Sequence, residues 1–283
     1  MVNDMKISIV TDSTADLDDE VIARYGITVV PLNIHFGSES YIDGISINRD
    51  EFYQKLEQSE ILPRTSQPSS GVFQKTYESL EPVDGIVSIH IGGKLSGTIN
   101  AARNGAELRK TGSPKVLIVD SDQTTVGLGN AVVAAAEAVK EGADLETIAL
   151  VAKEKAQQNR IFLMVDTLEY LQKGGRIGRA RAFLGTLLRT KPVLSLINGE
   201  IEGIERPRTR QRAIDRLYEL IIKTPKIKDV AILYGTTPND ANTLAARVSA
   251  GAPGTTVRIV RVSPVIGVHT GPAALGAAIE ISP

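Results

Sequence analysis

The sequence predicts an α/β fold with mainly parallel sheets, divided into two α/β domains. Apolar, β-branched runs alternate along the chain with segments whose apolar residues recur at helical spacing, which is the pattern of strand–helix–strand units. The chain has 283 residues, enough for two domains of ordinary size. We place the boundary near residue 160, giving an N-terminal domain 1–160 and a C-terminal domain 161–283, although no linker composition marks it.

The first strand and helix show the pattern clearly. Residues 6–12 (KISIVTD) read as a buried parallel strand. Residues 18–25 place apolar side chains at helical spacing, and Gly26 is a helix stop signal. Residues 27–36, apolar and β-branched, predict the second strand.

The same criteria predict the rest of the chain in order. In the N-terminal domain we expect helices at 49–58, with Asn48 as cap, and at about 70–80, with Ser69 or Ser70 as cap. Further elements there are strands 85–91 and 115–120 and helices 96–109, 126–141 and 144–159. In the C-terminal domain we expect strand 161–165, a hairpin of 192–197 with 200–206 around Asn198-Gly199, helices 209–222 and 238–249, and strands 229–234 and 256–262.

Composition excludes several classes of function. With 32 basic and 33 acidic residues the net charge is -1, so bulk attraction to nucleic acid or anionic membrane is not expected. The chain has no cysteine, and its three histidines, His35, His90 and His269, show no metal-ligand spacing. No signal peptide or membrane-spanning run is apparent. We expect a soluble cytoplasmic protein without metal, cofactor or stable membrane insertion.

Four polar segments follow predicted strands, where parallel sheets bind ligands: residues 11–14, 65–70, 94–98 and 120–122. Segment 65–70 is the most informative because its hydroxyl and amide groups offer neutral donors and acceptors, without a strong nucleophile or metal ligand. It is suited to binding a polar group rather than cleaving one.

The acidic segments have simpler explanations. Asp12 could begin an aspartate-nucleophile phosphatase motif, but Thr14 stands where that chemistry needs a second acid. We therefore expect Asp12, and likewise Asp120-Ser121, to cap helices or brace loops.

Ser96 lies between a strand and a helix, as the nucleophile of an α/β-hydrolase does. That motif needs Gly-x-Ser-x-Gly, and Lys94 and Thr98 occupy the glycine positions. Two interpretations stay open: the helix start binds an anion through its free N–H groups, or Ser96 is an ordinary N-cap.

The segment 173–216 holds 11 basic and 4 acidic residues in an otherwise neutral chain. Either it is a solvated face or it docks a partner. Gly174, Gly175 and Gly178 match neither the phosphate loop nor the dinucleotide motif, so no nucleotide site follows from them. His35 and His90 give no reason to expect more than ordinary strand residues, while His269 lies among small residues that allow close backbone approach.

Taken together, six segments resemble the DegV family, whose members include the fatty-acid-binding FakB subunits of bacterial fatty acid kinase. The segments are 10–16 (VTDSTAD), 65–69 (TSQPS), 95–98 (LSGT), 119–121 (VDS), 171–177 (LQKGGRI) and 267–272 (GVHTGP). The resemblance runs nearly from end to end. One departure is Ala273, where many relatives have glycine.

The resemblance implies a protein that binds one long-chain fatty acid in or beside the cleft between its domains. It is not an enzyme by itself but presents the carboxyl group to a separate ATP-dependent fatty acid kinase subunit. By position, the implied carboxyl contacts are Thr65, Ser96, Gly97 and His269, with supporting residues Ser66, Thr98 and Thr270. Arg176 and Arg208 match arginines of the kinase-facing surface.

Elementary energetics agree with this assignment. Burying a sixteen-carbon tail is worth roughly 0.8 kcal/mol per methylene, about 12 kcal/mol in all, which offsets an association cost of roughly 4–15 kcal/mol. The head group then needs orientation more than strength. His269 either pairs with the carboxylate as a cation or accepts its proton. The competing hypotheses are a phosphotransfer or hydrolytic enzyme acting through Asp12, Ser96 or His269, and nucleic-acid binding through segment 173–216, which neutral charge and scarce aromatic residues disfavour.

Overall fold

The chain divides into two compact units in a computed structural model that describes residues 5–80, 82–185 and 190–282. The N-terminal unit comprises Met1–Asn33 and Ser66–Gln157, and the C-terminal unit comprises Ile34–Thr65 and Gln158–Pro283. The chain passes between the units three times, and the last passage, between Gln157 and Gln158, lies close to the boundary expected near residue 160. Residues 34–65, expected in the first domain, group instead with the C-terminal unit.

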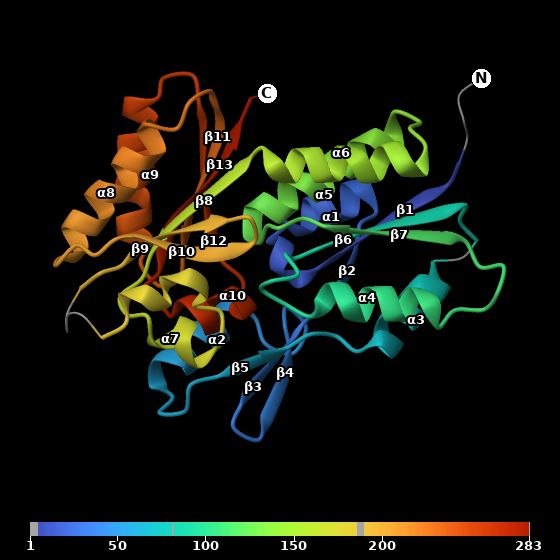
Figure 1. Cartoon of the computed structure of the whole chain (residues 1–283), viewed down its shortest axis with the longest axis horizontal. Coiled ribbons are helices and arrows are strands. Elements are labelled where there is room, and N and C mark those ends of the chain that lie inside the picture. Colours follow the sequence, from blue (N-terminus) through green and yellow to red (C-terminus); the bar gives the residue numbers. More distant parts are fainter. Residues whose placement is uncertain (1–4, 81, 186–189, 283) are drawn as a thin grey trace. The chain divides into compact units, whose positions relative to one another are not determined.

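The N-terminal unit is a parallel sheet covered by helices on both faces (Figure 1). Its strand order is β2-β1-β6-β7, formed by β1 (Ile7–Asp12), β2 (Thr28–Val30), β6 (Gly85–His90) and β7 (Lys115–Asp120). One face carries α1 (Asp19–Tyr25), α5 (Thr125–Lys140) and α6 (Leu145–Gln157). The other carries α3 (Ser70–Ser79) and α4 (Thr98–Glu107).

The alternation of strand side chains explains this layering. In β6, Val87 and Ile89 are buried with α5 and α6, whereas Ile86 is buried against α3 and α4. Successive strand residues point to opposite faces, so a strand covered on both sides buries every side chain, and all six residues of β6 are buried. Its polar members, Ser88 and His90, are hydrogen-bonded inside the protein.

The predicted strand 27–36 is divided in two. β2 ends at Val30, and β3 (Asn33–Phe36) belongs to a different, three-stranded sheet. Pro31 has no N–H to donate to a neighbouring strand, and the N–H of Leu32 donates to Ser13 Oγ at 3.2 Å instead. Strand pairing therefore stops at the proline.

The C-terminal unit contains a six-stranded sheet of order β10-β9-β8-β13-β11-β12. Its strands are β8 (Asn159–Met164), β9 (Val193–Ile197), β10 (Glu200–Glu205), β11 (Ile227–Tyr234), β12 (Thr256–Arg261) and β13 (Leu275–Ile281). α8 (Arg210–Ile222) and α9 (Pro238–Gly251) pack on one face. Among the strand pairs described in this six-stranded sheet, only β11 with β12 is parallel, and the others are antiparallel. The α/β class is confirmed, but this sheet differs from the mainly parallel arrangement expected.

Two elements introduce the antiparallel pairing: the β9–β10 hairpin and the strand β13. The hairpin expected at Asn198-Gly199 forms, and both residues have positive φ, 49° and 73°. β13 was not predicted, because its glycine and alanines are weak strand formers. It nevertheless lies between β8 and β11, and a Cβ on Gly276 would approach the carbonyl oxygen of Phe162 to 2.7 Å. Close strand approach requires the small residue there.

A three-stranded sheet of order β4-β3-β5 contains β3, β4 (Glu39–Ile42) and β5 (Arg64–Ser66). The helices α2 (Arg49–Gln58), α7 (Glu169–Lys173) and α10 (Pro264–Thr270) and the short 3-10 helices η1 (Ser13–Ala15) and η2 (Gly178–Phe183) complete the described elements. Asn48 caps α2 as predicted, in a reciprocal capping box with Glu51. Within residues 5–80, 82–185 and 190–282, no helix has the length and apolarity needed to cross a membrane.

Tight packing of α3 on α4 gives a test of the N-terminal unit. A Cβ on Gly105 of α4 would lie 2.5 Å from Phe73 Cβ and 2.7 Å from the carbonyl oxygen of Ser70. We expect Gly105→Ala to lower the free energy of unfolding by about 1–3 kcal/mol, because backbone and core atoms must move. The matched control is Gly71→Ala in α3, where the nearest atom is 3.8 Å away. It should be neutral or stabilising by up to about 1 kcal/mol. Urea unfolding of both variants measures the difference, and equal effects would contradict this packing.

Candidate functional site

Thr65 and His269, 204 residues apart, meet in the C-terminal unit. Thr65 lies in β5, His269 lies in the last turn of α10, and Thr65 Oγ1 is 2.9 Å from His269 Nε2. Both side chains are half-buried. Two of the residues expected to bind a carboxyl group therefore form one polar pair.

The packing of α2 on α10 brings this pair together. A Cβ on Gly267 would lie 2.7 Å from Phe52 Cε1 and 2.8 Å from the Tyr53 hydroxyl, so only glycine lets α2 approach so closely. The Tyr53 hydroxyl donates to the carbonyl of Val262 at 3.3 Å, and the Arg261 guanidinium lies over the Tyr53 ring. Because α2 precedes β5 in the chain, anchoring α2 on α10 places Thr65 beside His269.

The other ring nitrogen of His269 faces the start of the Gly174-Gly175 turn. A Cβ on Gly174 would lie 2.2 Å from His269 Nδ1, a clash that excludes any side chain there. Nδ1 is buried and has no hydrogen-bond partner among the described residues. Arg176 Nη1 donates to the carbonyl of Gly174 at 2.6 Å. The sequence singled out these glycines but gave no indication that Gly174 abuts His269.

Arg210 anchors the segment that follows His269. Its Nη1 donates to the carbonyl of Ala273 at 2.8 Å and to Asp166 at 2.9 Å, and its Nε donates to Asp240 at 2.7 Å. Ala273, the departure from the family pattern, is thus held through its backbone. Thr270 Oγ1 donates to the carbonyl of Ile266 within α10, 3.0 Å away.

Ser96, Gly97 and Thr98 lie together at the start of α4 in the N-terminal unit. The N-cap of α4 is Gly97 rather than Ser96, and Gly97 has no side chain with which to cap the helix. Ser96 Oγ lies 2.8 Å from Thr98 Oγ1 and accepts from the Thr98 N–H at 3.3 Å, so these two buried hydroxyls hold each other. The free N–H groups of the first turn carry the positive end of the helix dipole.

Segment 65–70 approaches the start of α4 through Gln67. A Cβ on Gly97 would lie 3.0 Å from Gln67 Nε2, so the amide packs on the glycine. Ser66 Oγ accepts from Asn33 Nδ2 at 3.4 Å, and Ser69 is the N-cap of α3, as predicted.

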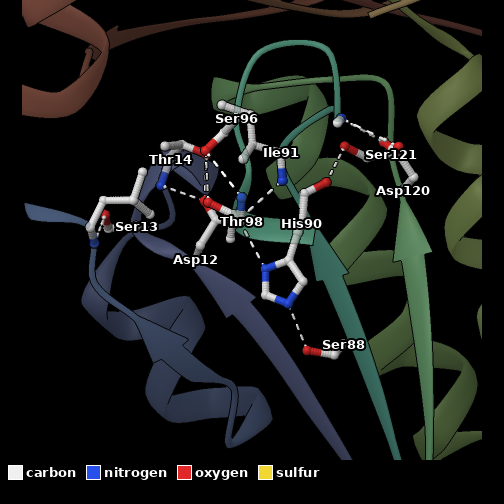
Figure 2. Close-up of polar contacts among 12 residues, drawn as sticks. Asp12, Ser13, Thr14, Ser88, His90, Ile91, Ser96, Thr98, Asp120 and Ser121 are labelled. Atoms are coloured by element: carbon white, nitrogen blue, oxygen red, sulfur yellow. Dashed lines mark hydrogen bonds and ion pairs between the residues drawn. The ribbon is translucent and has the colours of Figure 1, made fainter. Parts of the chain in front are cut away.

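A chain of buried polar groups lies at the ends of β1 and β6 (Figure 2). The carboxylate of Asp12 accepts from the Thr14 N–H and hydroxyl on one oxygen, at 3.1 and 2.5 Å. Its other oxygen lies 2.9 Å from His90 Nδ1 and accepts from the Ile91 N–H at 3.0 Å. Asp12 braces loops and caps η1, as expected, and it has no exposed surface from which to act as a nucleophile.

The expectation that His90 is an ordinary strand residue is wrong in one respect. Its ring is fully buried and bonded on both sides, to Asp12 and, through Nε2, to Ser88 Oγ at 2.7 Å. The contact with Asp12 joins residues 78 positions apart, so no pattern in the sequence indicates it. Asp120 and Ser121 brace the same region, as predicted: Asp120 accepts from the Gly93 N–H at 3.1 Å, and Ser121 Oγ donates to the carbonyl of His90 at 2.6 Å.

Much of the positive charge of segment 173–216 is neutralised. Several cations pair with acids outside the segment, namely Lys173 with Glu169, Lys191 and Arg210 with Asp166, Arg210 with Asp240 and Arg216 with Glu219. Arg176 is half-buried, and Arg208 is exposed with no ion-pair partner among the described residues. Arg189 lies outside the described residues. Over the described part of the chain, no cluster of three or more His, Cys, Asp or Glu side chains could hold a metal ion.

Comparison with known proteins gives matches over nearly the whole chain. A family model described as uncharacterised proteins of the DegV family matches residues 6–282. A DegV domain-containing protein from Streptomyces coelicolor is 37% identical over 279 residues, which are 97% of this chain and 98% of that protein.

Two solved structures are also similar to this chain. A fatty-acid-binding DegV family protein from Thermus thermophilus has a TM-score of 0.88 and 35% identity, covering 98% of this chain and 100% of its own. DegV from Bacillus subtilis, a fatty acid binding protein, has a TM-score of 0.89 and 32% identity with the same coverage.

The environment of His269 predicts its titration. Burial of the ring, followed by the nearby positive charge of Arg176, lowers the pKa of His269 to about 4. We expect its imidazole NMR signals to titrate near pH 4, and Arg176→Gln to raise that midpoint. The unfolded chain binds this proton already near pH 6.5, so the contribution of His269 to stability is lost as the pH falls from about 6.5 towards 4. A midpoint near 6.5 in the folded protein would contradict this description of the ring.

Proposed function

Because this chain belongs to the DegV family, we propose that it binds one long-chain fatty acid, buries the acyl tail and presents the carboxyl group to a separate ATP-dependent fatty acid kinase subunit. Two relatives above 30% identity, with nearly complete coverage, are fatty-acid-binding proteins. The polar residues of this chain are compatible with a carboxyl ligand, and the acyl tail supplies most of the affinity, roughly 0.8 kcal/mol per buried methylene.

The pair of Thr65 and His269 is the single observation that carries the carboxyl assignment. Thr65 Oγ1 is already within 2.9 Å of His269 Nε2, so one ligand group could contact both. A hydroxyl both donates and accepts, which suits a carboxyl group in either protonation state. We propose that Thr65, Ser96, the N–H of Gly97 and His269 bind the carboxyl group, with Ser66, Thr98 and Thr270 supporting them.

Because His269 is neutral in the free protein, its proposed contact with the carboxyl group is only moderately strong. With a pKa lowered to about 4, the ring is neutral at pH 7 in the free protein. An incoming carboxylate favours the protonated ring, so binding raises the pKa of His269 and strengthens as the pH falls towards the value in the complex. A neutral grip also permits release, which a protein that hands on its ligand requires.

A lipid-binding measurement tests this function. Protein purified from a bacterial host should carry fatty acid, seen by mass spectrometry of a solvent extract, and delipidated protein should bind added palmitate or oleate. Purified protein that carries no fatty acid and also fails to bind added palmitate or oleate would overturn the proposal.

Substitution at Thr65 tests the carboxyl contact itself. Thr65→Val keeps the shape but removes the hydroxyl, and a lost hydrogen bond to a charged group costs roughly 1.5–3 kcal/mol. We expect the Kd for palmitate to rise about 10- to 100-fold while the Kd for hexadecanol, which lacks a carboxyl group, stays within about twofold. Thr243→Val is the control, because Thr243 Oγ1 only bonds the Asn239 carbonyl of its own helix. Equal losses for acid and alcohol would argue against a carboxyl contact.

The proposed docking of a kinase subunit rests on the exposed basic side chains of segment 173–216 that form no ion pair with described residues. In the described part of segment 173–216, Arg181, Arg208 and Arg212 are exposed and have no ion-pair partner there. Such unpaired cations suit an acidic partner surface, where charge complementarity accelerates association. Arg176 would contribute beside Gly174, whose carbonyl it already contacts.

Charge reversal separates docking from lipid binding. Arg208→Glu should slow ATP-dependent phosphorylation of bound palmitate by a bacterial fatty acid kinase subunit about tenfold, most strongly at low salt, with the palmitate Kd unchanged. Lys110→Glu, which changes an exposed cation outside the basic segment, is the control. If both variants present palmitate as well as the unmodified protein does, Arg208 is not part of a docking surface.

A further inference from the structure

We propose that His90 is a positioning residue that fixes, through Asp12, the β6–α4 loop (residues 91–97), which ends at Ser96 and Gly97. The inference rests on the proposed function, since it concerns the loop that would bind the carboxyl group. It assigns a role to a buried histidine that touches neither Ser96 nor Gly97.

The proton positions follow from Asp12. Its carboxylate accepts from the N–H and hydroxyl of Thr14 and from the N–H of Ile91, and its fourth neighbour is His90 Nδ1. A carboxylate can only accept, so His90 Nδ1 carries a proton and donates. Each oxygen of Asp12 thereby receives two donors, as a fully buried carboxylate requires.

The far side of the ring is fixed as well. His90 Nε2 lies 2.7 Å from Ser88 Oγ, and Ser88 Oγ lies 2.9 Å from the Tyr77 hydroxyl. With the ring neutral and its proton on Nδ1, Nε2 can only accept, so Ser88 Oγ donates to it. Ser88 has no second proton, so the Tyr77 hydroxyl donates to Ser88 Oγ, and every group in the chain from Tyr77 to Asp12 is satisfied.

This arrangement acts on the loop at its first residue. The Ile91 N–H that Asp12 accepts begins the β6–α4 loop, and the Thr14 groups on the other oxygen belong to η1 after β1. Asp12 therefore ties together the ends of two neighbouring strands, and His90 holds Asp12 in the orientation that reaches both (Figure 2). Farther along, the N–H groups of Leu95 and Ser96 donate to the carbonyl of Gly92. Fixing the start of the loop therefore also restrains the residues that lead to Gly97.

The same contacts exclude a direct chemical role. Ser88, His90 and Asp12 have the contact order of a hydrolase triad, but all three side chains have no exposed surface. Ser88 therefore cannot meet a substrate, and the geometry serves to orient.

Three substitutions of His90 test the inference. The amide nitrogen of Asn can replace Nδ1, so His90→Asn keeps the donor to Asp12. His90→Gln places its amide near the position of Nε2 and loses that donor, and His90→Leu loses both contacts. The control is His35→Leu, since His35 is a strand histidine of the C-terminal unit whose Nδ1 contacts Ser40. Thermal melts establish that each variant is folded, and the Kd is measured for palmitate and for hexadecanol.

Selective loss of the carboxyl ligand is the expected result. His90→Gln and His90→Leu should raise the Kd for palmitate at least tenfold and leave that for hexadecanol within about twofold, whereas His90→Asn and His35→Leu should change neither by more than about threefold. If His90→Leu does not fold, the comparison of His90→Asn with His90→Gln decides. Parallel losses of both ligands, or no difference between these two variants, would overturn the positioning role while leaving fatty acid binding intact. An unmodified protein that binds neither ligand would overturn the proposed function and this inference with it.

Discussion

A buried carboxylate must have its lone pairs filled by donors, and that requirement organises the N-terminal unit around Asp12. Desolvating an unpaired carboxylate costs several kcal/mol, so the surrounding chain is held wherever it supplies the donors. The donors come from the segment after β1, from the start of the β6–α4 loop and from the ring of His90. Loops that would otherwise be free at the ends of parallel strands are thereby set in one conformation.

The C-terminal unit reaches the same precision by steric means. Gly267 admits the aromatic rings of α2, and Gly174 leaves room for the ring of His269, in both cases because a Cβ would overlap its neighbours. Packing to crystal-like density makes such contacts intolerant of even one added carbon. The result is a Thr65–His269 pair held from both sides, with one ring nitrogen bonded and the other buried and unpartnered among the described residues.

The polar chemistry gathered by these constraints is neutral and mild. Hydroxyls, backbone N–H groups and an imidazole whose pKa lies well below neutrality can orient a carboxyl group without the tight grip of an arginine pair. The head-group site that we propose would suit a ligand whose affinity comes from its tail and which has to be released. Basic side chains of segment 173–216 that pair with acids such as Asp166 are already neutralised, which reduces the number of cations left for the proposed partner.

The sequence by itself determined the features that depend on near neighbours: the α/β class, the capping box at Asn48, the hairpin at Asn198-Gly199 and the loop-bracing role of Asp12. Propensity and capping act over a few residues, so these signals are visible in one dimension. Only the tertiary structure decided that β13 lies inside a largely antiparallel sheet, that residues 34–65 group with the C-terminal unit, and that Gly174 abuts His269. The partners in those contacts are far apart in the chain, and burial overrides the weak strand preference of glycine and alanine. The burial that makes His90 a donor to Asp12 likewise exists only once β1 and β6 are paired.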